Sequence, residues 1–94
     1  MLNDYENALL QLKIIESETN LSEDFELLAH VYQKQASIYQ KLGHMDDART
    51  SADKALQLFS KLQDVIGESK VYVTLARIST HQSKYKESVQ YLQN

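Results

Sequence analysis

Residues 32–58 read YQKQASIYQKLGHMDDARTSADKALQL, and this stretch decides the fold. Tyr32, Ala36 and Tyr39 are spaced three and four residues apart, which places them on one face of a helix. Gly43 follows where a helix commonly ends on a left-handed residue, and the chain then turns. A second apolar stripe comes after the turn, at Ala48, Ala52, Ala55, Leu56 and Phe59. A helical hairpin of this kind cannot bury both of its faces alone, so we expect further copies of it.

A shift of forty residues brings out these copies. It aligns residues 4–9 (DYENAL) with residues 44–49 (HMDDAR) and with residues 84–89 (KYKESV). The same shift aligns residues 32–36 (YQKQA) with residues 72–76 (YVTLA). Such a period is typical of stacked helical hairpins, in which neighbouring units bury each other's apolar faces. The sequence therefore predicts an all-α chain, and the absence of proline favours the same conclusion.

The period and the residue types together resemble the tetratricopeptide repeat, in the variant with a forty-residue period. The positions that match its pattern or replace it conservatively are Tyr32, Ala36, Tyr39, Gly43, Ala48, Ala55 and Leu56. Gln35 stands where the pattern usually has leucine, and Ser83 stands where it has glycine. The segment from Ala55 to Gly67 is similar to the variant's signature Ala-Leu-x-Leu-Phe-x-x-Leu-x-Asp-x-x-Gly. The resemblance implies a right-handed superhelix of antiparallel hairpins whose first helices line a groove.

We expect about five helices in a single domain. Its parts are the second helix of a partial repeat at 1–20, a complete repeat at 22–62 and a second, truncated repeat at 64–94. The fifth helix would begin at Lys84. Ala36 and its counterpart Ala76 are small residues at the centres of two first helices, and both should face a neighbouring helix.

The helix ends follow from capping residues. We expect Ser22, or alternatively Asn20, to cap the second helix, and Asp64 to cap the fourth. Gly67 falls in the first turn of the fourth helix, where glycine is unfavourable by up to about 1 kcal/mol against alanine. We therefore expect the preceding helix to come close at Gly67.

The composition excludes several classes of protein. The chain has no cysteine, which excludes a disulfide framework, a thiolate zinc site and a cysteine nucleophile. No apolar run approaches the roughly 18 residues of a membrane span, and no targeting signal opens the chain, so we expect a cytoplasmic protein without a membrane partner. Residues 1–26 carry a net charge of −6 and residues 27–94 a net charge of +3. This balance is too weak to indicate nucleic acid, which usually meets a strongly basic face.

No motif for catalysis, a cofactor or a metal is present. Glycine-rich phosphate loops, Gly-x-Ser-x-Gly and His-Glu-x-x-His are all missing. His30, His44 and His81 are not four residues apart, as two ligands on one helix face would be. Asp46 and Asp47 are consecutive and point apart on a helix, where they suit the dipole of its first turn. We therefore expect a non-catalytic protein that needs no cofactor and binds no metal.

Candidate binding residues lie on the groove face, rotated away from the core face of each first helix. In the middle repeat and the next one they are His30, Gln33, Ser37, Gln40, Lys41, Lys70, Val73, Arg77, Thr80 and His81. Those we single out are Gln33, Ser37, Lys41, Lys70 and Arg77. The planar guanidinium of Arg77 can bind a carboxylate through two hydrogen bonds, which favours an anionic or C-terminal peptide segment. The alternative is that these are ordinary solvated charges.

The resemblance implies protein–protein or peptide binding in a pre-formed groove. Gln33 and Ser37 stand where the family's carboxylate-clamp subset needs lysine and asparagine, so the binding of chaperone tails is not carried over. Two other functions stay open: oligomerisation through the unfinished ends of the stack, and a regulatory sensor domain of a larger bacterial-type transcription regulator or kinase. The ends lack the polar faces of finished caps, which predicts a segment of a longer array.

Overall fold

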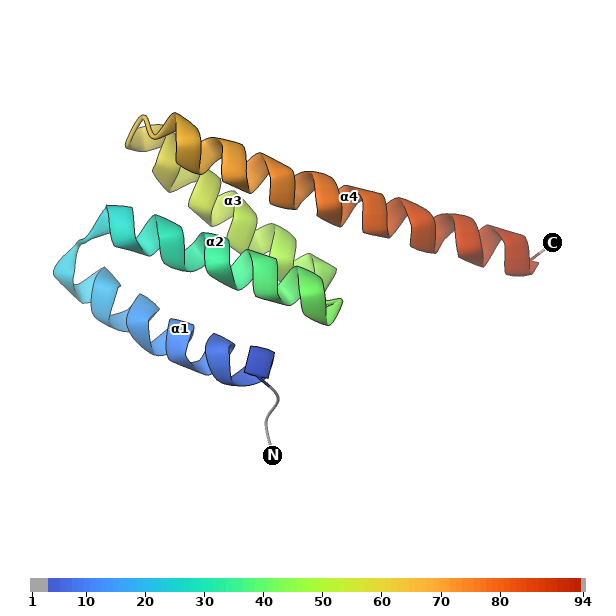
Figure 1. Ribbon diagram of the computed structural model, residues 1–94, viewed down its shortest axis with the longest axis horizontal. Helices are drawn as coiled ribbons and strands as arrows, with labels where there is room; N and C mark the ends of the chain where they lie inside the picture. Colours follow the sequence, from blue (N-terminus) through green and yellow to red (C-terminus); the bar gives the residue numbers. More distant parts are fainter. Residues whose placement is uncertain (1–3, 94) are drawn as a thin grey trace.

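The structure, a computed structural model, describes residues 4–93 and the side chains of residues 4–83. Within these residues the chain forms four helices and no strand, which confirms the all-α prediction. The helices are α1 (Asp4–Ser22), α2 (Phe25–Leu42), α3 (Met45–Lys61) and α4 (Val65–Gln93). Successive helices run in opposite directions, with α2 and α3 in the middle of the stack (Figure 1). α2 packs against the other three helices, whereas α1 packs against α2 alone.

The turn between α2 and α3 forms as the sequence predicts. Gly43 has a φ of 84°, in the left-handed region, and ends α2. The N–H of Gly43 donates to the carbonyl of Gln40 at 3.2 Å, and that of His44 donates to Tyr39 at 2.9 Å. These two bonds satisfy carbonyls that the end of the helix would otherwise leave free.

The other two turns use a left-handed residue that is not glycine. Glu23 has a φ of 58° and Gln63 a φ of 57°. In the second of these turns the N–H of Asp64 donates to the carbonyl of Phe59 at 2.9 Å. The turns at Glu23 and Gln63 therefore close with the same pair of backbone hydrogen bonds as the turn at Gly43. In each of them a residue with a side chain takes the left-handed conformation, which is strained.

The start of α2 differs from the prediction. Its N-cap is Asp24, whose Oδ1 accepts a hydrogen bond from the N–H of Leu27 at 3.1 Å, and neither Ser22 nor Asn20 takes this role. α1 continues through both residues because no glycine or proline stops it. The hydroxyl of Ser22 instead donates to the carbonyl of Thr19 at 3.1 Å. At α4 the predicted cap is confirmed, since Asp64 Oδ1 accepts from the N–H of Gly67 at 3.0 Å.

Small side chains fill most of the core between the helices. The two buried clusters consist of Ala29, Ala36, Ala52, Ala55, Phe59 and Val71, and of Met45, Ala48 and Ile78. Ala36 is fully buried, as the repeat pattern predicts. Alanines at the contact let helix axes approach toward the lower end of the usual range of about 8–10 Å.

Gly67 is a point of close approach, which the sequence also predicts. A Cβ atom added to it would lie 2.5 Å from Cε1 and 2.6 Å from Cγ of Phe59. Phe59 is itself fully buried, so its ring has no free space to move into. The absence of a side chain at Gly67 therefore sets how closely α4 can lie on α3.

Two expectations for the C-terminal part are wrong. No separate fifth helix begins at Lys84, because α4 continues to Gln93 and extends well past α2 and α3 (Figure 1). Ser83 holds the position of Gly43, and the glycine that favours a helix end at Gly43 is therefore missing there. Ala76 is exposed, since no described helix covers that side of α4. The expected helix positions Met1 to Asn3 and Asn94 lie outside the described residues.

None of the described helices combines the length and apolar character that crossing a membrane requires.

The turn geometry predicts changes of opposite sign in the free energy of unfolding for substitutions at Gly43 and Gln63. Gly43→Ala should lower the free energy of unfolding by about 1–2 kcal/mol, because alanine is strained in the left-handed region. Gln63→Gly should raise it by up to about 1 kcal/mol, since the same strain is relieved but the unfolded chain gains freedom. Nothing lies within 4 Å of a Cβ added at Gly43, so the loss there measures backbone strain alone. Urea denaturation of both variants tests this prediction. If both substitutions changed the free energy of unfolding in the same direction, the prediction would be contradicted.

The contact at Gly67 gives a second prediction. Gly67→Ala should lower the free energy of unfolding by about 1–3 kcal/mol through overpacking, although alanine is the better helix former. Ser69→Ala, at an exposed position two residues further along α4, is the matched control and should change stability little. Adding Phe59→Leu to Gly67→Ala should cost less than the sum of the two single changes, because a smaller side chain relieves the overlap. If the losses of unfolding free energy from the two single changes simply add in the double variant, the side chains at the two positions do not overlap.

Candidate partner-binding groove

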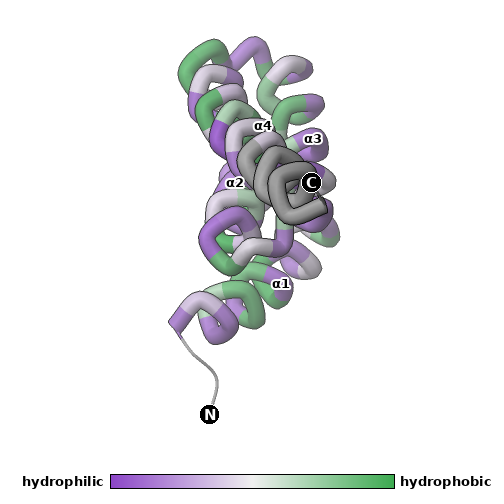
Figure 2. Tube along the Cα trace, turned by 90° about the vertical axis from the view of Figure 1, so that its right-hand side faces the viewer, coloured by the Kyte–Doolittle hydropathy of each residue, from purple (hydrophilic) through white to green (hydrophobic). Residues whose placement is uncertain are grey.

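α2 and α4, which the sequence predicts to be the first helices of two repeats, contact each other across one face of the stack. In the side view of Figure 2, α2 and α3 lie side by side and α1 lies below them. A pocket of about 460 Å³ opens between α2 and α4. Its lining residues are Gln40, Val73, Ala76, Arg77, Thr80 and His81. This pocket lies on the face where the sequence predicts a groove, beside Gln40 in the C-terminal half of α2.

Among the lining residues whose side chains the structure describes, Arg77 alone has a fixed charge. It is exposed, and none of the other described lining residues is acidic. Gln40 contributes an amide from α2, and His81 lies one turn beyond Arg77 on α4. The described lining of the pocket thus combines a guanidinium with an amide and an imidazole and includes no carboxylate. A guanidinium can donate two parallel hydrogen bonds to a carboxylate.

Gln33 lies between the two helices and is half-buried. Its Nε2 donates a hydrogen bond to Oγ1 of Thr74 at 2.9 Å, and that hydroxyl donates to the carbonyl of Lys70 at 3.3 Å. Because the hydroxyl proton is used on Lys70, Thr74 must accept from Gln33, which fixes the orientation of the amide. The other amide atom, Oε1 of Gln33, is buried and has no hydrogen-bond partner among the described residues. Gln33 therefore holds α2 to α4 instead of projecting into the groove.

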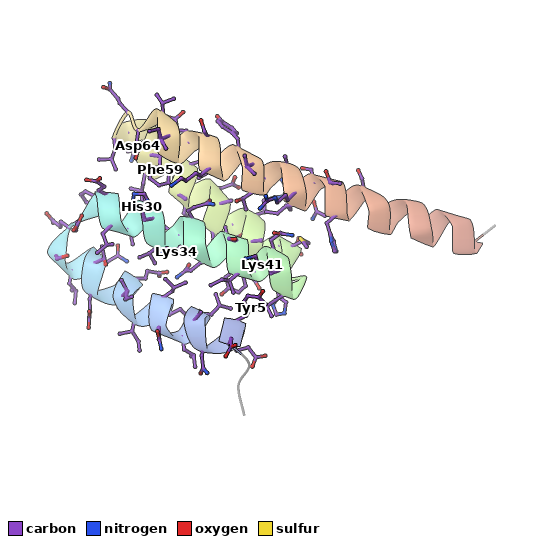
Figure 3. All side chains as sticks on the ribbon, viewed as in Figure 1. Tyr5, His30, Lys34, Lys41, Phe59 and Asp64 are labelled. Atoms are coloured by element: carbon purple, nitrogen blue, oxygen red, sulfur yellow. The ribbon has the colours of Figure 1, made fainter. Side chains whose placement is uncertain are left out.

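The structure separates the other predicted residues from Arg77. Lys41 leans the opposite way, with its Nζ 5.8 Å from the centre of the Tyr5 ring on α1 (Figure 3). Lys70 is exposed and Ser37 half-buried, and neither lines the pocket. Of the five residues singled out from the sequence, the pocket contains only Arg77. Ala76, which the sequence assigned to the core, lines the pocket instead.

Two of the three histidines, His30 and His44, pack against aromatic rings. The ring of His30 meets the ring of Phe59 edge to face, with 5.1 Å between centroids (Figure 3). The ring of His44 stacks on Tyr39 at 6.1 Å, and its Nδ1 lies 3.8 Å from Oδ2 of Asp47. Among the residues whose side chains are described, no three His, Asp or Glu side chains gather into a metal site.

A second pocket, of about 430 Å³, opens on the opposite side, where α1 and α3 flank α2. Its floor contains Gln35, which is 4% exposed and donates from Nε2 to Oε1 of Glu16 at 2.9 Å. The sequence places Gln35 on the core face at a position that leucine usually holds, but gives no sign of its partner on α1. This hydrogen bond explains how a polar side chain is tolerated there.

The Gln33–Thr74 pair gives a third prediction. Thr74→Val should lower the free energy of unfolding by about 1–3 kcal/mol, because it leaves the buried amide of Gln33 without its acceptor. Gln33→Met in the same chain should restore most of that loss, since neither helix then carries a buried polar group at the contact. Urea denaturation of the two single variants and the double variant measures the coupling. Simple additivity would show that the hydrogen bond does not form.

Residues 29–61, which span most of α2 and all of α3, match a family model described as the tetratricopeptide repeat. Comparisons with curated proteins and with solved structures gave no match.

Proposed function

Because residues 29–61 are a tetratricopeptide repeat, a unit of protein–protein interaction, we propose that this chain is a non-catalytic module that binds a partner peptide in the groove between α2 and α4. The observation that carries the proposal is the pocket beside Arg77. Arg77 is exposed, the described lining of the pocket contains no acid, and a guanidinium can bind a carboxylate with two parallel hydrogen bonds. The partner is therefore an acidic segment or a free C-terminus.

The spacing of cations along α4 narrows the partner further. Lys70 and Arg77 are seven residues apart, so they lie on one face of α4, about 10 Å from each other along its axis. Two residues of an extended peptide that are three positions apart span about the same distance. The groove suits a peptide with two carboxylates at this spacing, one for each cation. Ser37 would contact the peptide only further along α2, and Lys41 would have to turn away from Tyr5 to reach it.

Arg77→Ala supplies the fourth prediction. It should weaken binding of an acidic peptide about tenfold or more, since a hydrogen bond to a charged group contributes about 1.5–3 kcal/mol. Arg77→Lys keeps the charge but loses the planar fork, and should recover only part of the affinity. Lys61→Ala removes one positive charge from α3, outside the pocket, and is the matched control with unchanged affinity. Calorimetry or fluorescence anisotropy measures the affinities; equal binding by Arg77→Ala would remove the groove assignment.

A second candidate function is self-assembly. Large apolar side chains are exposed at both sides of the stack, with Leu10 and Ile14 on α1 and Tyr72 on α4. Exposed apolar patches of this kind mark interaction sites. The two candidates are compatible, because the pocket beside Arg77 opens between α2 and α4 and α1 does not border it.

A further inference from the structure

We propose that this chain forms a parallel dimer through α1, in which the side of α1 that points away from α2 pairs with the same side of a second copy. The partner is thus a second copy of the chain, and the contact is a short two-stranded coiled coil. The proposal rests on self-assembly, the second candidate function, and gives it a face, a register and an orientation.

α1 has two different sides, and only one of them packs on the rest of the chain. Its buried and half-buried residues lie toward α2, and they are Ala8, Leu9, Leu12, Glu16 and Thr19. Three large apolar residues lie on the other side: Leu10 is 51% exposed, Ile14 is 60% exposed and Leu21 is 87% exposed. At 3.6 residues per turn these three fall within about 40° of one another around the helix axis. We call them the outer stripe, because α1 lies at the edge of the stack (Figure 1).

Stacking of repeats does not account for the outer stripe. The forty-residue shift places its three residues at positions of α3 that hold Thr50, Lys54 and Lys61. α3 packs against both α2 and α4, and all three of these residues are nevertheless exposed. This includes Lys54, although its Nζ lies 5.4 Å from the centre of the Tyr32 ring of α2. A further repeat stacked on α1 would therefore leave the outer stripe in water, so its apolar residues point to a contact outside the stack.

The outer stripe has the spacing of a coiled coil. Leu10, Ile14 and Leu21 are separated by four and seven residues, which places them at positions d, a and a of a heptad written a to g. Asn7 takes the preceding a position, and Ser17 takes the remaining d position. Isoleucine at a with leucine at d favours two parallel strands, and a single asparagine at a specifies the register. α1 is already folded on α2, so pairing does not carry the cost of helix formation that makes short isolated helices marginal.

The charges beside the stripe select the orientation. Lys13 takes a g position, Glu18 takes the e position five residues later, and both are exposed. In a parallel pair this g residue faces that e residue of the other helix, and two-fold symmetry forms the Lys–Glu contact twice. The preceding g–e contact joins Glu6 to Gln11, so no two acids face each other across the seam. An antiparallel pair would place g beside g, and Lys13 could not meet Glu18.

The rest of each stack stays clear of this contact. α2 packs on the side of α1 opposite the outer stripe, so α2, α3 and α4 of both copies extend away from the seam. A contact of one face with itself is closed, so the assembly stops at a dimer. The pocket beside Arg77 lies between α2 and α4, and α1 does not border it. Each dimer therefore presents two open peptide pockets.

Sedimentation velocity on variants of α1 tests the face, and this is the fifth prediction. Ile14→Glu places a carboxylate at the centre of the outer stripe and should keep the chain monomeric at concentrations where the unchanged chain is a dimer. Ile14 is exposed, and circular dichroism checks that the fold is kept. Thr50→Glu adds the same charge at an exposed site of α3 and is the matched control, which should dimerise as the unchanged chain does.

Charge exchange tests the pairing of Lys13 with Glu18. Lys13→Glu and Glu18→Lys should each raise the dissociation constant of the dimer about tenfold, because each loses two Lys–Glu contacts and gains two contacts of like charge. An equal mixture of the two variants should recover the affinity of the unchanged chain, since the mixed pair has opposite charges at both contacts. High salt should reduce all of these differences.

Single cysteines test the orientation, because the chain has no cysteine of its own. Asn7→Cys and Ser17→Cys place the thiol at two positions of the seam, about 15 Å apart along α1. In a parallel pair each thiol lies opposite its own copy, so both variants should form a disulfide-linked dimer on mild oxidation. In an antiparallel pair only a position at the centre can meet itself, so at most one variant would do so. Thr50→Cys, on α3, is the control that should stay unlinked.

Three results would overturn the proposal. An unchanged chain that stays monomeric at its highest concentration would remove self-assembly together with this dimer. A dimer that Ile14→Glu does not weaken would leave self-assembly standing through another surface. Disulfide formation by only one of the two seam variants, or a charge-exchanged mixture that does not recover its affinity, would contradict the parallel pairing. None of these results bears on the peptide pocket, which the affinity of Arg77→Ala tests separately.

Discussion

The contact between Phe59 and Gly67 is the constraint on which the stack depends. Phe59 is the largest fully buried side chain in the described part of the protein, and the core around it consists mainly of alanines. Alanines alone would let the helices slide along one another, because their short side chains do not interdigitate. The ring of Phe59 fits only where α4 has no Cβ, at Gly67, and it meets His30 of α2 edge to face. One side chain thus sets the relative positions of three helices.

This constraint also places the groove. With α4 held on α3 at its first turn, the helix runs alongside α2, and Thr74 comes within hydrogen-bonding distance of Gln33. The next turns of α4 then carry Arg77 and His81 past Gln40. A change in the height of α4 on α3 would shift Arg77 relative to α2. The chemistry of the pocket is therefore determined by a packing contact at the other end of the hairpin.

The sequence predicted those features that depend on local residues and failed on those that depend on distant ones. Gly43 and Asp64 act through bonds to residues at most five positions away, so their roles can be recognised without a structure. The turn at Glu23 could not be recognised from the sequence, because nothing local distinguishes a strained left-handed residue from its neighbours. The position of Ala76 depends on whether a further helix lies on α4. The partners of Gln33 and Gln35 lie 41 and 19 residues away, and only packing brings them together.

For the groove residues, the sequence predicted the helix face on which each residue lies better than the direction in which its side chain points. Spacing along a helix fixes where each Cα and Cβ lies, and by that rule Arg77 is correctly placed beside the pocket. A long side chain such as that of Lys41 can still turn toward an aromatic ring on another helix, as it does toward Tyr5. A polar side chain at an interface is directed instead by its hydrogen bonds. The amide of Gln33 is buried where it donates a hydrogen bond to Thr74. Its Oε1 has no described hydrogen-bond partner, and the desolvation of that atom costs about 1–3 kcal/mol. A leucine would avoid that cost but would fix neither the spacing nor the register of α2 and α4, and those two quantities position Arg77 opposite Gln40.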